Sequence, residues 1–112
     1  MLPVIEIRTY QLREGCAEQF HQTMHQQALV LLSAAGHDVL AALPSADDAT
    51  TYMLVRAYNS RAHRQSSQDD FYASAAWVDG PRAAIMGCIA SYHTVVLKAE
   101  PSLIASMRRL DA

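Results

Sequence analysis

Side chains alternate along residues 4–12, as expected for an extended chain whose successive residues point to opposite faces. The segment is rich in β-branched and aromatic residues, which favour strands. The pattern therefore predicts a strand that ends at Arg13-Glu14-Gly15. One face would carry Ile5, Ile7 and Thr9, and the other Val4, Glu6, Arg8 and Tyr10.

Three more segments have extended character. Residues 50–58 and 89–97 alternate strongly, and residues 37–43 form a short apolar run closed by Pro44-Ser45. Residues 50–58 would present Tyr52, Leu54, Arg56 and Tyr58 on one face and Met53, Val55 and Ala57 on the other. In the last segment, Ser91, His93 and Val95 would lie opposite Tyr92, Thr94 and Val96.

The apolar spacing changes to three and four residues between Cys16 and Ala35, which predicts a helix ended by Gly36. Its buried positions would be Phe20, Met24, Ala28, Leu31 and Ala35. Asn59 or Ser60 would cap a second helix that runs to about Ala76. Its inward positions would be Arg64, Gln68, Phe71 and Ala75.

Two shorter helices complete the pattern. The turn Asp79-Gly80-Pro81 would start one that extends through about Gly87, and another would follow Pro101. The last helix would be amphipathic, with Leu103, Ile104, Met107 and Leu110 on its apolar side. Its basic pair, Arg108 and Arg109, lies at its C-terminal end.

The predicted order, β-α-β-β-α-(α)-β plus a tail helix, is that of a ferredoxin-like α+β sandwich, the split βαβ pattern. A four-residue echo supports two equivalent strands: Ile7-Arg8-Thr9-Tyr10 resembles Val55-Arg56-Ala57-Tyr58. We expect these strands to be parallel central neighbours, with their two Arg-x-Tyr pairs side by side.

Composition narrows the class of protein. The chain has 112 residues and is 51% hydrophobic, enough for one folded domain. A formal net charge of −2 argues against binding to nucleic acid or an anionic membrane. The start of the sequence has no basic segment typical of a signal peptide, and two cysteines are too few for a disulfide framework. We therefore expect a cytoplasmic protein.

The sequence resembles the NIPSNAP domain over roughly residues 4–98. The run Glu6 to Gly15 is similar to the opening strand of that family, in which Glu-x-Arg-x-Tyr precedes a helix started by glycine. Ala57-Tyr58-Asn59-Ser60 with His63-Arg64 is similar to its second central strand and helix start, and Trp77 stands where the family often has tryptophan. His63 replaces the family's usual acid, and Arg56 replaces a common aromatic residue.

The resemblance implies a dimeric α+β barrel, in which each subunit has a pocket between sheet and helices. It divides the chain into a NIPSNAP-like domain at residues 1–100 and a helical tail at residues 101–112. The partners would be a second copy of the chain and a small-molecule ligand. No bound metal or organic cofactor is expected.

The polar face of the central strands is the first candidate site. Five polar side chains, Glu6, Arg8, Tyr10, Arg56 and Tyr58, fall on positions that should be buried, where an unpaired charge is costly. Two interpretations follow. They form a closed Glu6–Arg8 or Glu6–Arg56 network, or the arginines hold an anionic or carbonyl oxygen while tyrosine donates a hydrogen bond.

Other candidates lie on the helices and the last strand. His21 and His25 are four residues apart, a spacing that suits two ligands of one metal ion. Alternatively, His21 is a partly buried, hydrogen-bonded side chain, or it transfers a proton in the pocket. Arg64 would meet a ligand or pair with Glu6 or Asp70. Tyr72 and Trp77 would line the pocket mouth or the core, and His93 matters only if it shares the face of Arg8.

Three functions fit these residues. The first is a cofactor-free enzyme, similar to a monooxygenase or an isomerase, that acts on a small polar or aromatic carbonyl compound. Arg8, Arg56 and Arg64 would hold negative charge, and His21 or Tyr10 would move the proton. The second is a non-catalytic ligand-binding or structural dimer. The third is a haem-binding barrel protein that uses His21 or His25.

Overall fold

One antiparallel sheet organises the chain, and it is described over residues 2–108 of a computed structural model. Its strand order is β2-β3-β1-β4. The central strands are β1 (Val4–Leu12) and β3 (Thr51–Tyr58), and the edge strands are β2 (Asp38–Pro44) and β4 (Ile89–Lys98). This order, with the helices between the strands, confirms the predicted ferredoxin-like α+β class.

The two central strands run in opposite directions. Val4 pairs with Tyr58 and Gln11 with Thr51, so the expectation of parallel neighbours was wrong. A helical crossover separates β1 from β2, whereas residues 45–50 connect β2 to the antiparallel β3 and reverse the chain. Glu6 consequently lies opposite Arg56, and the two Arg-x-Tyr pairs are not side by side.

The first helical segment contains an unexpected π-helical turn. It consists of α1 (Ala17–Thr23), the π-helical η1 (Met24–Ala28) and α2 (Leu29–Ala34). Because a π turn holds more residues than an α turn, the buried positions stay four apart and reach Leu32. The predicted positions Leu31 and Ala35 are half-buried and exposed.

The second helical segment breaks earlier than predicted. The Ser60 side chain accepts a hydrogen bond from the His63 backbone amide at 3.0 Å and caps α3 (Arg61–Ala73). Ser74 has extended backbone angles and starts the short α4 (Ala75–Val78), which α5 (Arg82–Cys88) follows. The bend leaves the predicted inward residue Ala75 exposed and turns Trp77 into the core.

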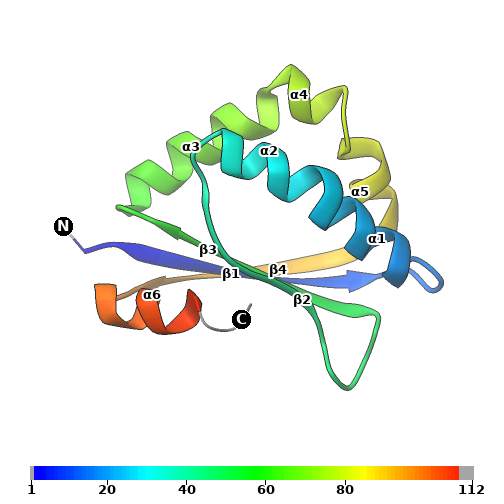
Figure 1. Cartoon of the computed structure of the whole chain (residues 1–112), viewed down its shortest axis with the longest axis horizontal. Helices are drawn as coiled ribbons and strands as arrows, with labels where there is room; N and C mark the ends of the chain where they lie inside the picture. The colour runs from blue at the N-terminus through cyan, green and yellow to red at the C-terminus, as the bar shows by residue number, and fades with distance from the viewer. Residues whose placement is uncertain (1, 109–112) are drawn as a thin grey trace.

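Helices α1 to α5 cover one face of the sheet, and α6 (Pro101–Met107) alone lies against the other (Figure 1). Ile104 and Met107 pack against a second apolar cluster that includes Ile5 and Val55. Arg108 donates two hydrogen bonds of 2.6 Å to the Asp38 carboxylate and ties the end of this helix to β2. The predicted Arg109 and Leu110 lie outside the described residues.

Part of this second face carries apolar side chains that reach solvent. We call it the open face, and it consists of Ile7, Thr9, Met53, Val95 and Leu97. Val95 and Leu97 are 41% and 42% exposed. Among residues 2–108, no helix has the length and apolar character to cross a membrane.

Gly36 and Gly87 allow a matched test of where the backbone requires glycine. Gly36 has φ +87 and ends α2, where the His37 amide donates to the Leu32 carbonyl at 2.9 Å. Gly87 lies within α5 with open space around its Cα. We expect Gly36→Ala to lower the free energy of unfolding by about 1–2 kcal/mol and Gly87→Ala to raise it by about 0.5–1 kcal/mol in urea denaturation. Equal effects of the two substitutions would contradict this assignment.

Candidate functional site

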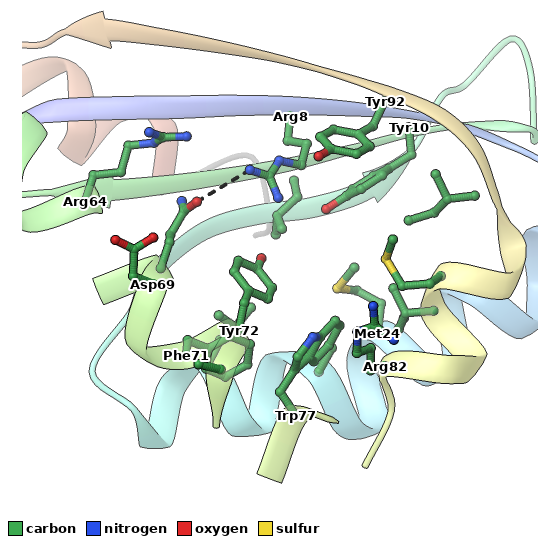
Figure 2. Close-up of a pocket in the computed structure, with 18 of the residues that line it drawn as sticks. Arg8, Tyr10, Met24, Arg64, Asp69, Phe71, Tyr72, Trp77, Arg82 and Tyr92 are labelled. Atoms are coloured by element: carbon green, nitrogen blue, oxygen red, sulfur yellow. Dashed lines mark hydrogen bonds between the residues drawn. The ribbon is translucent and has the colours of Figure 1, made fainter. Parts of the chain in front are cut away.

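A cavity of about 610 Å³ lies between the sheet and the helices. Side chains from β1 and β4 form one wall, and side chains from η1, α3, α4 and α5 form the other (Figure 2). Arg8 and Arg64 lie at one end, and Met24 and Trp77 lie at the other (Figure 2). We call the first end the cationic end; the other end is lined mainly by apolar side chains, with the exposed Arg82 beside them (Figure 2).

A fully buried carboxylate, Glu6, anchors the cationic end from below. Arg56, also fully buried, donates to Glu6 Oε1 from Nε at 3.2 Å and from Nη2 at 2.5 Å. Oε2 accepts from Arg64 Nε at 2.7 Å and from Gln68 Nε2 at 2.5 Å. Arg8 is less tightly paired, with its Nη2 3.6 Å from Oε2. One carboxylate thus serves three arginines.

The arginines keep Glu6 ionised. Burial acts to raise the pKa of the Glu6 carboxyl, but the charges of Arg56 and Arg8 and hydrogen bonds from Arg56 and Gln68 outweigh it. The net effect lowers the pKa of Glu6 from 4.5 to about 2. The predicted Glu6–Arg56 network is therefore present as a closed ion pair beneath the cavity.

Arg8 is held from the β4 side so that its guanidinium faces the cavity. Its Nε donates to Thr94 Oγ1 at 3.1 Å, and its Cζ lies 5.2 Å from the centre of the Tyr92 ring. Nη2 makes a long contact of 3.5 Å with Gln68 Oε1 (dashed in Figure 2). The Arg8 side chain is 14% exposed and that of Arg64 is 19% exposed. Both cations can therefore be reached from the cavity.

Two tyrosines place hydroxyl groups near these cations. Burial is the main cause that raises the pKa of Tyr10 to about 12, and the nearby Tyr72 raises it further. The charges of Arg8 and Arg56 lower this pKa but do not outweigh burial. The Tyr72 hydroxyl accepts a hydrogen bond from Arg56 Nη1 at 2.8 Å. Tyr10 is protonated at neutral pH, so it serves as a hydrogen-bond donor rather than as a base.

Tyr58 belongs to the buried network rather than to the cavity wall. Its hydroxyl accepts from Gln68 Nε2 at 3.3 Å and lies 2.8 Å from His37 Nδ1. Burial, reinforced by the charge of Arg56, lowers the pKa of His37. His37 is therefore a neutral imidazole at pH 7 and extends the network toward the start of β2.

The two histidines expected near the ligand lie elsewhere. His21 Nδ1 is 2.7 Å from the Tyr52 hydroxyl, and His25 Nε2 donates to the Ala42 carbonyl at 2.9 Å. Neither lines the cavity, because both lie on the side of the first helical segment that faces β2 and β3. His93 pairs with Thr9 on the opposite face of the sheet from Arg8. His21 and His93, predicted as site residues, therefore do not line this cavity.

The other predicted site residues are brought together. Arg8, Tyr10, Arg64, Tyr72 and Trp77 line the cavity, and Glu6, Arg56 and Tyr58 lie beneath its cationic end. Tyr92 also lines the cavity and was not among the predicted site residues, although strand alternation places it on the Arg8 face and the register pairs it with Tyr10. Met24, predicted only as a buried helix position, also lines the wall, and further wall residues without a sequence signal include Asp69, Arg82 and Ile85.

No group of three or more His, Cys, Asp or Glu side chains gathers within residues 2–108 in a way that could hold a metal ion. The cavity wall instead supplies guanidinium, hydroxyl and amide donors, one carboxylate, and apolar surface. This donor set can bind and orient an oxygen-rich group on an otherwise apolar molecule.

Comparison with solved structures identifies the fold. A NIPSNAP-like domain protein from Burkholderia xenovorans superposes with a TM-score of 0.79 at 15% identity, covering 88% of this chain and 86% of that one. A NIPSNAP family protein of unknown function from Agrobacterium tumefaciens gives 0.77 at 18% identity, with coverages of 89% and 93%. A protein from Bordetella bronchiseptica, provisionally described as an antibiotic biosynthesis monooxygenase, gives 0.69 at 19% identity, with coverages of 89% and 99%.

No family model and no curated protein matches the chain. The likeness to the solved structures nevertheless shows that the chain has the fold of NIPSNAP domain proteins, as the residues of its opening strand and second central strand predicted. Identities below 20% carry the fold and not the chemistry.

The buried carboxylate makes stability depend on pH. Because the pKa of Glu6 is lower in the folded chain, its stabilisation is complete above about pH 4.5 and is lost as the pH falls toward 2. The shift corresponds to about 3 kcal/mol. We expect Glu6→Gln to lower the free energy of unfolding at pH 7 by about 3–5 kcal/mol, since Arg56 stays buried without its carboxylate.

Urea denaturation between pH 7 and pH 3 checks this prediction. The Glu6→Gln variant should lose most of the acid dependence that the unmodified chain shows. Asp70→Asn, which changes an exposed carboxylate on α3, should shift the free energy of unfolding at pH 7 by less than about 0.5 kcal/mol. Parallel pH profiles for Glu6→Gln and the unmodified chain would show that Glu6 does not carry the effect.

Proposed function

We propose that this chain binds a small polar or aromatic carbonyl compound in the cavity between sheet and helices. The observation that carries the proposal is the pair of partly exposed arginines, Arg8 and Arg64, at the end of an otherwise largely apolar cavity. Glu6 pairs closely with Arg64 but lies 3.6 Å from Arg8, and a mostly buried charge with so distant a partner is costly. A ligand oxygen at this end would accept hydrogen bonds from Arg8 and Tyr10.

The remaining wall suits the body of such a ligand. Tyr72 and Trp77 lie with their ring centres 5.4 Å apart, and Met24 lies at the same end (Figure 2). Aromatic and thioether side chains pack well against planar or apolar groups. The volume of about 610 Å³ is typical of sites for small molecules.

The proposal is binding and includes no reaction. The fold shared with the Bordetella bronchiseptica protein does not assign one, because a fold of this kind hosts many activities. Of the two groups expected to move a proton, His21 is outside the cavity and Tyr10 is held protonated. A haem ligand from His21 or His25 would likewise have to leave its hydrogen bond to Tyr52 or Ala42.

The single tryptophan of the chain, Trp77, reports directly on the cavity. In ¹H–¹⁵N NMR spectra its indole gives one resonance, which should shift in a saturable way on titration with a neutral aromatic ketone such as acetophenone. Ala28→Leu would place a larger side chain on the cavity wall and should weaken binding roughly 10-fold. Ala83→Leu, on the exposed side of α5, should leave the affinity unchanged.

A non-saturating shift, or equal affinities for Ala28→Leu and Ala83→Leu, would count against binding in this cavity. Thermal unfolding of both variants provides the control for damage to the fold. A variant that keeps its melting temperature but loses binding separates occupation of the cavity from stability.

We also propose that two copies of the chain associate through the open face. Val95 and Leu97 are exposed there beside the half-buried Ile7 and Met53, and burying such a patch against a copy of itself is favourable. A closed pair of identical patches is also the usual form of a homodimer. The ligand cavity lies on the opposite face of the sheet, so association would leave it accessible.

Neighbouring residues of β4 test this association. Val95 belongs to the open face, whereas Val96 pairs with Glu6 and faces the helices. Analytical ultracentrifugation should show a dimer for the unmodified chain and for Val96→Lys, and a monomer for Val95→Lys. A dimer that survives Val95→Lys, or a monomeric unmodified chain, would contradict association through this face.

A further inference from the structure

The charges around the cavity do not balance. Three arginines line it, Arg8 and Arg64 at the cationic end and the exposed Arg82 at the other, against one carboxylate, Asp69. The formal excess is two positive charges, 3 − 1. Beneath the wall, Arg56 and Glu6 cancel each other. The whole chain has a formal net charge of −2, so the excess belongs to this cavity and not to the protein at large.

The available carboxylates do not satisfy Arg8. Both oxygens of Glu6 are already engaged at 2.5–2.7 Å by Arg56, Arg64 and Gln68, while Arg8 stays 3.6 Å away. Asp69 is exposed and accepts from Gln65 Nε2 at 2.8 Å, and no ion pair joins it to Arg8 or Arg64. Arg8 is thus a mostly buried cation whose nearest carboxylate is used by others.

The orientation of Arg8 is fixed mainly by neutral groups, because the Glu6 carboxylate is 3.6 Å away. Thr94 and the Tyr92 ring hold its guanidinium from the β4 side, and Gln68 touches it from α3. Figure 2 shows the Arg8 and Arg64 guanidinium groups at the same end of the cavity, with the Tyr10 hydroxyl directed toward that end. Donors that are pre-oriented in this way cost little to use when a ligand arrives.

From this arrangement we infer that the ligand is a carboxylate with an aromatic or apolar body, whose carboxylate pairs with Arg8 beside Arg64. A planar guanidinium matches the two oxygens of a carboxylate, and charge-assisted hydrogen bonds are the stronger ones. The ligand body extends toward Trp77 and Met24 at the other end. This inference rests on the proposed function and narrows its ligand from carbonyl compounds in general to organic anions.

A matched pair of probes tests the charge. 3-Phenylpropionate is ionised at neutral pH, and 3-phenylpropionamide has the same body and a neutral carbonyl group. Titrations that follow the Trp77 indole resonance should give at least about 10-fold tighter binding for the carboxylate than for the amide. Raised salt should narrow this ratio only modestly, because the site is enclosed.

Two substitutions that each remove one positive charge show which arginine causes the preference for the carboxylate. Arg8→Gln should reduce the ratio of the two affinities to about one, whereas Arg61→Gln, at an exposed position of α3 outside the cavity wall, should keep it. Arg8→Lys should keep part of the preference, because charge remains without the planar pair of donors. If Arg8→Gln fails to fold, Arg64→Gln gives the same comparison from the second cation, with a partial loss of the preference expected.

The outcomes separate the two proposals. Saturable binding of both probes with equal affinity would overturn the carboxylate inference and leave cavity binding standing. A preference for the carboxylate that Arg8→Gln and Arg64→Gln both retain would also overturn it. If neither probe shifts the Trp77 resonance, binding in the cavity fails, and the inference about its ligand fails with it.

Discussion

The ion pair between Glu6 and Arg56 is the interaction on which the rest of the site depends. Both side chains are fully buried on neighbouring central strands, directly across from each other in the register. Neither could stay there alone, because an unpaired charge in the interior costs several kcal/mol. The pair fixes the position of Arg64 and Gln68 on α3 through the second carboxylate oxygen. It therefore joins the helical layer to the sheet by polar contacts.

The same ion pair also determines which arginine has no carboxylate within hydrogen-bond distance. One carboxylate has room for two close cationic partners and an amide, so the third arginine, Arg8, lies at a longer distance and faces the cavity. The closed network and the proposed ligand site, which are the two sequence-based interpretations, are thus compatible. Arg56 belongs to the closed network, and Arg8 belongs to the cavity wall.

The two faces of the sheet have separate chemistry because strand alternation keeps them apart. Glu6, Arg8 and Tyr10 point toward the helices, while Ile5 and Ile7 point toward α6 and the open face. Because the cavity and the open face lie on opposite faces, the proposed ligand binding and the proposed association of two copies would not compete. The break at Ser74 adds to this division, since it turns Trp77 toward the core beside the cavity.

The sequence alone determined the class of fold and most of the polar wall, because alternation with a period of two decides which side chains share a face. Glu6, Arg8 and Tyr10 follow from that pattern directly. It could not determine how strands pair: the antiparallel register that sets Glu6 against Arg56 depends on the route of the chain between them. Nor could it place His21, because its contact with the Tyr52 hydroxyl joins a helix to β3 and is a tertiary feature. Only the folded chain decides which of several buried cations is left partly unpaired, since that depends on distances of a few ångströms between residues far apart in sequence.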